Sequence, residues 1–331
     1  MKALLSHAPG GPDTLRVDEM PDPVAGPGEL LVRVRACSIN YPDVLIIEDK
    51  YQLKPPRPFA PGSEIAGEVE ALGENVTGWA PGDRLIAATG FGGLVEKVVV
   101  KAATAIPLPA ERSFEEGSAL LLTYATAIHA LADRGTLKPG ETLLVLGGAG
   151  GVGIAAIEIG KAMGARVVAA VSSADKAEAA TAAGADETVV YPAGPFDPDS
   201  RKQLSALFKA ALPAGGADCI LDPVGGDYSE AALRAIAWEG RFLVVGFPAG
   251  IARLPLNLTL LKSCDVCGVF WGAFAARDPQ ANAAHVAQLF RWWEEGKIAP
   301  RVSATFPLER GGEAIAALRD RRAVGKLVVT L

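Results

Sequence analysis

Residues 140–176 read GETLLVLGGAGGVGIAAIEIGKAMGARVVAAVSSADK, and the rest of the chain is best understood outward from this stretch. The apolar run 142–146 is long enough for one buried parallel strand, and a glycine-rich loop follows it. From Ile154 the apolar residues recur at helical spacing until Gly164, and 166–171 again has the composition of a strand. Strand, glycine loop, helix and strand within about 30 residues is the size of a dinucleotide-binding unit.

The glycine loop matches the pattern G-x-G-x-x-G at Gly148, Gly150 and Gly153. In such loops the first glycine permits a tight turn, the second lets the backbone approach a pyrophosphate, and the third lets the helix pack closely on the strand. Free N–H groups at the positive end of the helix, here those of Gly151 and Val152, would bind the phosphates. The motif alone is a weak signal, but a strand before it and a helix after it supply the context that it needs.

The end of the second strand predicts which dinucleotide is bound. An NAD site places Asp or Glu there, to bond the ribose 2′-OH. This chain instead offers the hydroxyls of Ser172 and Ser173 and the ammonium of Lys176, which suit a 2′-phosphate. Asp175 lies past the strand tip, and we expect it to cap the following helix. The sequence therefore favours NADPH over NADH.

Composition sets the broad class of the protein. A chain of 331 residues that is half hydrophobic and 21% charged is long enough for two well-packed domains. The net charge is −6 and no basic tract occurs, so nucleic-acid binding is not expected. No signal peptide and no apolar run of the ~20 residues needed for a membrane span are visible, so we expect a cytoplasmic protein.

Two domains are expected from the order of the elements. Residues 1–105 are rich in strands and turns and predict a β-rich, partly open barrel. From residue 142 onward strands alternate with helices, which predicts an α/β fold with a doubly wound parallel Rossmann sheet. We place the dinucleotide-binding domain at 123–260 and the catalytic domain at 1–122 together with 261–331.

Five stretches in order along the chain carry a resemblance to a known family. They are ACSINYPD at 36–43, PGSEIAG at 61–67, GGAGGVG at 147–153, DPVGG at 222–226 and GKLV at 325–328. Together they resemble the medium-chain dehydrogenase/reductase superfamily, and within it the zinc-free NADPH:quinone oxidoreductase (zeta-crystallin-like) branch. The resemblance covers essentially the whole chain and implies a GroES-like barrel beside the Rossmann domain.

The resemblance also separates this chain from the zinc-dependent members of the superfamily. Those enzymes place a zinc-binding cysteine about where Asn40 lies and a histidine where Ser63 lies, and many carry a four-cysteine zinc loop that is missing here. The three histidines of this chain lie far apart, with no companions at ligand spacing, so no metal site is expected. Alcohol oxidation needs a Lewis acid to stabilise an alkoxide, whereas a quinone or an α,β-unsaturated carbonyl delocalises the charge that it accepts.

Two residues are candidates for the reacting end of the site. Asn40 follows a strand, where an exposed carboxamide could bond the nicotinamide end or a substrate carbonyl, or could be a turn residue only. Tyr51 lies in a proline-rich loop, where its phenol could stack on nicotinamide, donate a proton or merely pack. The family places a tyrosine near the cofactor at this point. Asp43 could cap a helix, order the loop or take part in function.

Further cofactor contacts follow from the resemblance. Thr123 begins a helix expected over 123–132, where it could cap that helix or bond the cofactor. Tyr191 ends the third strand, where it could simply pack in the core, and the resemblance implies that it flanks the 2′-phosphate beside Lys176. The remaining candidates are Asp222, Val224, Gly246, Phe247, Phe270 and Lys326.

Assembly and two alternative functions complete the expectations. The apolar strand 263–270, near the end of the Rossmann sheet, predicts a homodimer by pairing at the sheet edge. An enoyl-thioester reductase of the same fold is one alternative, although no basic grip for a CoA or carrier phosphate is evident. A non-catalytic NADPH-binding protein is the other, because fold does not determine function.

Overall fold

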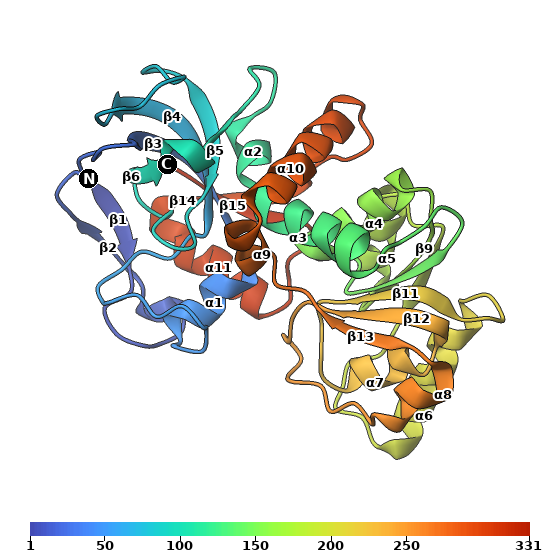
Figure 1. Ribbon diagram of the computed structural model, residues 1–331. Coiled ribbons are helices and arrows are strands. Elements are labelled where there is room, and N and C mark those ends of the chain that lie inside the picture. The colour runs from blue at the N-terminus through green and yellow to red at the C-terminus, as the bar shows by residue number, and fades with distance from the viewer. The chain divides into compact units, whose positions relative to one another are not determined.

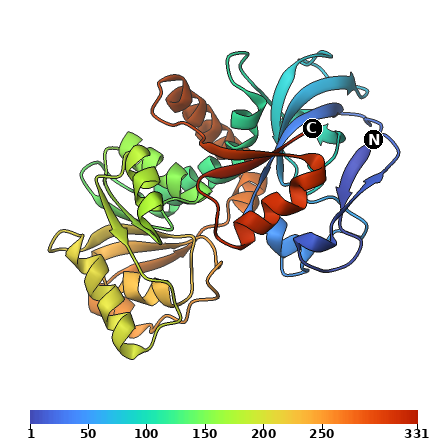
Figure 2. The ribbon, with the colours of Figure 1, turned by 180° about the vertical axis from the view of Figure 1, so that it is seen from behind.

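A computed structural model describes the whole chain, Met1–Leu331, as two compact units (Figure 1). The first unit consists of Met1–Leu122 and Pro300–Leu331, and the second unit consists of Thr123–Ala299. Within the first unit the C-terminal strand returns to pair with a strand from the N-terminal part, as the view from behind shows (Figure 2). None of the helices is both long and apolar enough to cross a membrane.

The second unit keeps residues 261–299, which were expected in the other domain. Strand β13 (Asp265–Gly268) pairs in parallel with β12 (Ile236–Val244), so the chain is still part of this sheet after residue 261. Helices α9 (Trp271–Arg277) and α10 (Pro279–Glu294) then follow in the same unit. The expected boundary at residue 261 is therefore corrected to the end of this segment.

The sheet of the second unit has six parallel strands in the order β10-β9-β8-β11-β12-β13. Its first four strands in sequence are β8 (Thr142–Leu146), β9 (Arg166–Val171), β10 (Glu187–Val190) and β11 (Ala217–Asp222). Counted along the chain, the spatial order is third, second, first, fourth, fifth, sixth, which is typical of dinucleotide-binding sheets. The order reverses between β8 and β11, and ligands of such sheets bind outside the carboxyl ends of the strands at this point. The predicted fold class is confirmed.

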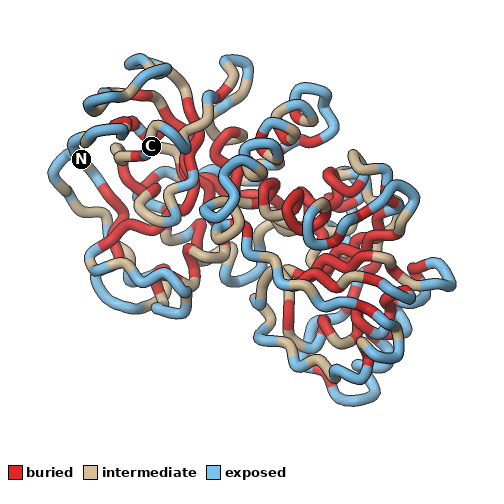
Figure 3. The backbone as a smooth tube through the Cα atoms, in the orientation of Figure 1, coloured by how far each residue is buried: buried red, intermediate tan, exposed pale blue.

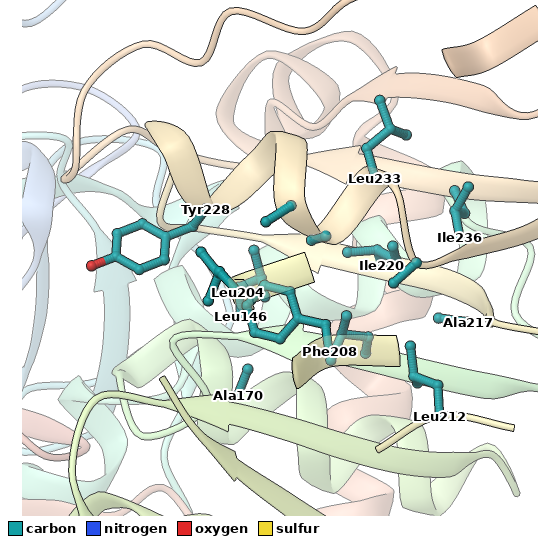
Figure 4. Packing of buried hydrophobic residues seen from close by; sticks show 14 of the residues in the cluster. Leu146, Ala170, Leu204, Phe208, Leu212, Ala217, Ile220, Tyr228, Leu233 and Ile236 are labelled. Carbon is teal, nitrogen blue, oxygen red and sulfur yellow. The ribbon is translucent and has the colours of Figure 1, made fainter. Parts of the chain in front are cut away.

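Helices cover both faces of this sheet, α4 and α5 on one face and α6, α7 and α8 on the other (Figure 1). Their bounds are α4 (Gly151–Ala162), α5 (Ala174–Ala182), α6 (Pro198–Ala210), α7 (Asp227–Leu233) and α8 (Asn257–Lys262). Phe208 and Leu204 of α6 pack on strand residues that include Leu146, Ala170 and Ile220 (Figure 4). Burial on both faces explains why β8 is apolar at nearly every position.

The segment that leads into this sheet is less regular than the helix expected over 123–132. Two wide π-helical stretches, η3 (Leu121–Ala125) and η4 (His129–Arg134), flank the single α-helical turn α3 (Thr126–Ile128). The segment packs against α4, since α3 contacts that helix. Helical stretches of this kind are uncommon and are often found near functional sites.

The first unit contains a seven-stranded sheet in the order β14-β15-β3-β4-β5-β7, with β6 also paired to β3. The strands are β3 (Glu29–Ile39), β4 (Glu64–Leu72), β5 (Arg84–Ala88), β6 (Lys97–Lys101), β7 (Ile106–Pro107), β14 (Val302–Pro307) and β15 (Lys326–Thr330). A separate pair, β1 (Lys2–Leu5) with β2 (Arg16–Glu19), and the helices α1 (Tyr41–Ile47), α2 (Phe114–Ser118) and α11 (Gly311–Arg319) complete the unit. Buried segments follow the long strands, while the turns between them are exposed (Figure 3).

Candidate functional site

The glycine loop joins β8 to α4, and a different steric constraint favours glycine at each of three positions. Gly147 has a φ of +60°, which favours glycine, so the tight turn is made there. A Cβ at Gly153 would lie 2.2 Å from the Gly147 carbonyl oxygen, so this glycine is required for close packing, as predicted. A Cβ at Gly148 would lie 2.9 Å from the Cβ of Ala169 on β9. Gly148 is therefore a packing glycine, and the expectation that it makes the tight turn is corrected.

Gly150 differs from its neighbours because protein packing does not require it to be glycine. A Cβ there would meet only the Gly147 carbonyl oxygen, at 3.4 Å. Gly150 is the N-cap of α4, and its carbonyl accepts the first i→i−4 bond, from the Ile154 N–H. The N–H groups of Gly151, Val152 and Gly153 precede that bond, so they can bind a ligand at the positive end of a twelve-residue helix. This geometry fits a pyrophosphate.

Hydroxyl and ammonium groups meet at the carboxyl end of β9. The Nζ of Lys176 donates a hydrogen bond of 3.0 Å to the Oγ of Ser172, so the two predicted phosphate ligands lie together. Ser173 is the N-cap residue of α5, and Asp175 lies in the first turn of that helix. The expectation that Asp175 caps the helix is therefore wrong, although a carboxylate in the first turn still favours the helix dipole.

Tyr191 follows β10, directly beside the end of β9. Its backbone N–H donates to the Val171 carbonyl at 2.8 Å. The ring is 7% exposed and packs edge-on against Phe208 and tilted against Tyr228, with centroid distances of 6.2 and 4.9 Å. The ring is therefore chiefly part of the core, which is the alternative that its sequence position left open.

The loop after β11 is shaped by the buried carboxylate of Asp222. One oxygen accepts the N–H groups of Val224 and Gly225 at 2.8 and 2.9 Å, and the other accepts the Ser229 hydroxyl. Burial raises the pKa of Asp222. Because one oxygen is engaged by the loop and the other by Ser229 of α7, Asp222 orders the site and does not present a free carboxylate to a ligand.

The remaining candidates of the second unit also lie at the carboxyl ends of strands. The side chain of Val224 would lie 2.9 Å from a Cβ placed on Gly147. The loops after β8 and β11 therefore meet at the point where the strand order reverses. Gly246 follows β12, and its N–H lies 3.4 Å from the Asp222 carbonyl. Phe247 beside it is 46% exposed, and Phe270, after β13, is 58% exposed. These predicted cofactor contacts therefore all lie at the carboxyl ends of the strands of this sheet.

Thr123 is the exception in the second unit, because it precedes the sheet. It lies in the π-helical stretch η3 and is 3% exposed. Its position on an irregular helical turn was not expected from the sequence.

A buried polar cluster lies in the first unit, where β3 ends and β4 and β15 begin. The Nζ of Lys326 donates to the Oδ1 of Asn40 and, at 2.8 Å, to the Oε1 of Glu64. The Nδ2 of Asn40 donates to the same Glu64 oxygen at 3.0 Å and to the Ser63 hydroxyl at 3.2 Å. Each of these four residues is at most 5% exposed. The expected exposed carboxamide of Asn40 is therefore corrected, and Lys326 likewise does not present an exposed ammonium.

Asp43 connects two of the sequence motifs. Its Oδ2 accepts the Asn40 N–H at 2.7 Å, which completes a capping box at the start of α1, and its Oδ1 accepts the Gly62 N–H at 2.9 Å. Burial raises the pKa of Asp43 to about 6, although the two backbone N–H groups act to lower it. Asp43 therefore orders the segment around Gly62 and also fixes the backbone of Asn40.

Tyr51 lies half-buried in the loop after α1. Burial raises the pKa of its phenol, and the charge of Asp43 raises it further. The phenol therefore keeps its proton across the neutral range and can donate it in a hydrogen bond.

Glu64 is the residue of this cluster that the sequence did not single out as functional. It receives hydrogen bonds from Lys326, Asn40 and the Ser38 hydroxyl, and its second oxygen accepts the Leu122 N–H at 2.8 Å. The available signal was a carboxylate followed directly by the uncharged run 65–67 at the start of a strand, because a buried charge needs a partner.

Comparisons with known proteins agree with this architecture. The alcohol dehydrogenase GroES-like domain family matches residues 26–110, and the zinc-binding dehydrogenase family matches residues 151–289. The quinone oxidoreductase-like protein 2 homolog of Nematostella vectensis is 35% identical over 308 residues, which cover 92% of this chain and 82% of that protein.

Two solved structures of relatives extend the comparison. Mycobacterial Rv1454c complexed with NADPH has a TM-score of 0.91 at 29% identity, and all of both chains is covered. Escherichia coli quinone oxidoreductase complexed with NADPH has a TM-score of 0.88 at 26% identity, again with all of both chains covered.

Proposed function

This chain belongs to the medium-chain dehydrogenase/reductase superfamily, in its quinone oxidoreductase (zeta-crystallin-like) branch, and from this premise we propose an NADPH-dependent reductase of quinones or α,β-unsaturated carbonyls. The observation that carries the proposal is the pairing of two anion sites at one sheet edge. The free N–H groups at the start of α4 form the first site, and the contact between Lys176 and Ser172 forms the second. The two NADPH-complexed structures of relatives support it.

Each group at this edge has a distinct task in holding the dinucleotide. The N–H groups of Gly151, Val152 and Gly153 would bind the pyrophosphate, because they are oriented donors at a positive helix end. Ser172 and Lys176 would bind the 2′-phosphate, the lysine as a point charge and the serine as a hydrogen-bond donor. Bound NADPH supplies a hydride from its nicotinamide ring, so the protein chiefly contributes binding and orientation.

Tyr51 is our candidate for donating a hydrogen bond or a proton to the reduced acceptor. Its phenol is protonated at neutral pH and can donate a hydrogen bond, while the raised pKa makes it a weaker acid than a free tyrosine. Asn40 is assigned a positioning role, because its amide is already engaged by Lys326 and Glu64.

We propose that this reaction needs no zinc. A zinc site takes three or four N, S or O ligands, most often thiolate, imidazole or carboxylate. The buried cluster of the first unit instead offers the amide of Asn40, the hydroxyl of Ser63 and one carboxylate, Glu64, that already holds the ammonium of Lys326. A cation in this cluster is therefore supplied by the chain itself.

The expected homodimer is supported by the surface beside β13. This strand is an edge of the six-stranded sheet, so its outer backbone groups can pair with another strand. Val266 on the strand is 40% exposed, and Leu260 and Leu261 of the preceding helix α8 are 78% and 62% exposed. We propose that a second copy covers this apolar surface. The cytoplasmic location stays a prediction.

An NADPH oxidation assay tests the proposed function. Purified protein is mixed with NADPH and a panel of 1,4-benzoquinone, 9,10-phenanthrenequinone, a simple enone and an enoyl-CoA, and absorbance at 340 nm is followed. We expect turnover with quinone or enone, both before and after prolonged chelation. Turnover with enoyl-CoA alone would favour the thioester reductase, and NADPH binding without turnover on any acceptor would favour a non-catalytic role.

A further inference from the structure

Glu158 is a charged residue in the middle of an enclosed helix. The eight consecutive residues 153–160 of α4 are all buried, and Glu158 is the charged one among them. The residue is only 9% exposed. Burying a carboxylate is costly unless it is hydrogen-bonded, so its partners indicate why it is there.

The partners of Glu158 lie at the two ends of the second unit. Its Oε2 accepts the hydroxyl of Tyr124 at 2.7 Å and the backbone N–H of Ala299 at 2.9 Å. Tyr124 is the second residue of this unit and is 1% exposed, while Ala299 is its last residue. One carboxylate oxygen on α4, the helix that begins at the glycine loop, is therefore hydrogen-bonded to residues at both ends of the second unit.

We infer that Glu158 is a positioning residue, which fastens the entry segment with Thr123 and the exit segment at Ala299 to the helix whose start binds the pyrophosphate. This inference rests on the proposed function, because it assigns the helix start to a dinucleotide. The tie fixes the neighbour of Thr123, so it sets where that residue lies relative to the glycine loop. It also holds Ala299, the last residue of the second unit, on α4.

The protonation state of Glu158 depends on pH, whereas a glutamine at this position would not titrate. A glutamine could accept both hydrogen bonds through its single amide oxygen, yet the chain carries a carboxylate. Burial raises the pKa of Glu158 to about 7, and the hydrogen bonds of Tyr124 and Ala299 act to lower it. Because both donors use Oε2, a proton on Oε1 would keep the geometry and remove the charge that strengthens the two bonds.

Other charged groups near this tie are paired elsewhere. On the elements packed against α4 or next to Ala299, His129 contacts Asp133, Lys297 pairs with Glu295, and Lys161 of α4 itself pairs with Asp186. None of them contributes to the pKa shift of Glu158. The Glu158 carboxyl is therefore the group of this contact that titrates near neutral pH. The pKa of its partner Tyr124 is raised well above its usual value by burial, so the phenol keeps its proton.

Hydrogen–deuterium exchange of the cofactor-free protein tests the tie directly. Glu158→Ala should raise the exchange rate of residues 121–126 and 297–299 by about tenfold, which is the loss of one ordinary hydrogen bond, and Tyr124→Phe, which leaves the Ala299 bond in place, should do so for residues 121–126 alone. Glu158→Gln should keep exchange slow, and Glu294→Gln on the exposed side of α10 serves as the matched control. Unchanged exchange in both Glu158→Ala and Tyr124→Phe overturns the inference.

Steady-state kinetics then test whether Glu158 positions the cofactor site or only stabilises the fold. In Glu158→Ala and Tyr124→Phe, kcat/KM for NADPH should fall about tenfold, while the Kd of 2′,5′-ADP, held at Ser172 and Lys176, should stay within about twofold. Faster exchange with intact kcat/KM would overturn the positioning role. If the wild type shows no NADPH turnover, the proposed function fails, and the exchange rates alone then support or overturn the tie.

Discussion

Lys326 and Glu64 form a buried ion pair, with 2.8 Å between Nζ and Oε1 and side chains that are 4% and 1% exposed. Lys326 is the first residue of β15 and Glu64 is the first residue of β4. Both strands pair antiparallel to β3, one on each side. The pair therefore connects the C-terminal strand β15 to β4 across β3. Both of its side chains also hydrogen-bond to the amide of Asn40.

Removing one partner of this pair should destabilise the protein strongly. Lys326→Met leaves the charge of Glu64 buried without an opposite charge, and such changes cost about 3–5 kcal/mol of unfolding free energy. Urea unfolding at pH 7 measures the loss. Lys161→Met, which breaks the more exposed pair with Asp186, is the control and should cost about 0–1 kcal/mol.

A double variant distinguishes an ion pair from mere packing. Lys326→Met combined with Glu64→Gln removes both charges, so it should recover a large part of the loss seen in Lys326→Met. A double variant that loses the full sum of the two single losses would contradict this account.

The pair also shows which features the sequence could and could not predict. Gly153 and the strand order follow from a local pattern, because strand, glycine loop and helix are adjacent in the chain. The contact between Lys326 and Glu64 joins residues 262 positions apart, and no local period reports it. The sequence did not predict the role of Glu158 for a related reason, because its partners Tyr124 and Ala299 lie 34 and 141 positions away along the chain.

Protein stability should depend on pH through Glu158. Burial raises the pKa of Glu158 from 4.5 in the unfolded chain to about 7 in the folded one, so the folded state binds more protons between these values. The contribution of this group to stability is therefore full below pH 4.5 and is lost as pH rises through 7. Glu158→Gln cannot titrate, so its stability relative to wild type should increase by ~1–3 kcal/mol from pH 5 to pH 8.

Thermal unfolding of wild type and Glu158→Gln at pH 5, 6, 7 and 8 measures this difference. The control is Glu294→Gln, whose side chain is exposed. A difference between wild type and Glu158→Gln that is constant across this range would show that Glu158 titrates normally.

The second edge of the six-stranded sheet provides a control for the homodimer. Val266 of β13 and Val190 of β10 are both exposed, at 40% and 48%, and they lie on the two opposite edge strands. Val266→Lys should give a monomer by sedimentation velocity, because a lysine on a pairing edge opposes association. Val190→Lys should leave the dimer intact. A wild type that sediments as a monomer at every concentration would rule out the proposed dimer.

Cofactor choice follows most directly from single residues. The ammonium of Lys176 lies 3.0 Å from the hydroxyl of Ser172, and a 2′-phosphate would receive charge-assisted bonds from both. Such bonds contribute about 1.5–3 kcal/mol each, so Lys176→Ala should weaken NADPH binding by about one to two powers of ten. NADH lacks the phosphate, and its Kd should hardly change. Ser172→Asp should go further, because a carboxylate repels the phosphate and offers the ribose 2′-OH an acceptor.

Titration calorimetry with both cofactors on wild type and the two variants measures these Kd values, and Lys202→Ala, at an exposed pair on α6, is the matched control. Equal weakening of NADPH and NADH by Lys176→Ala would contradict this assignment and favour Asp175, in the first turn of α5, as the residue that binds the ribose 2′-OH.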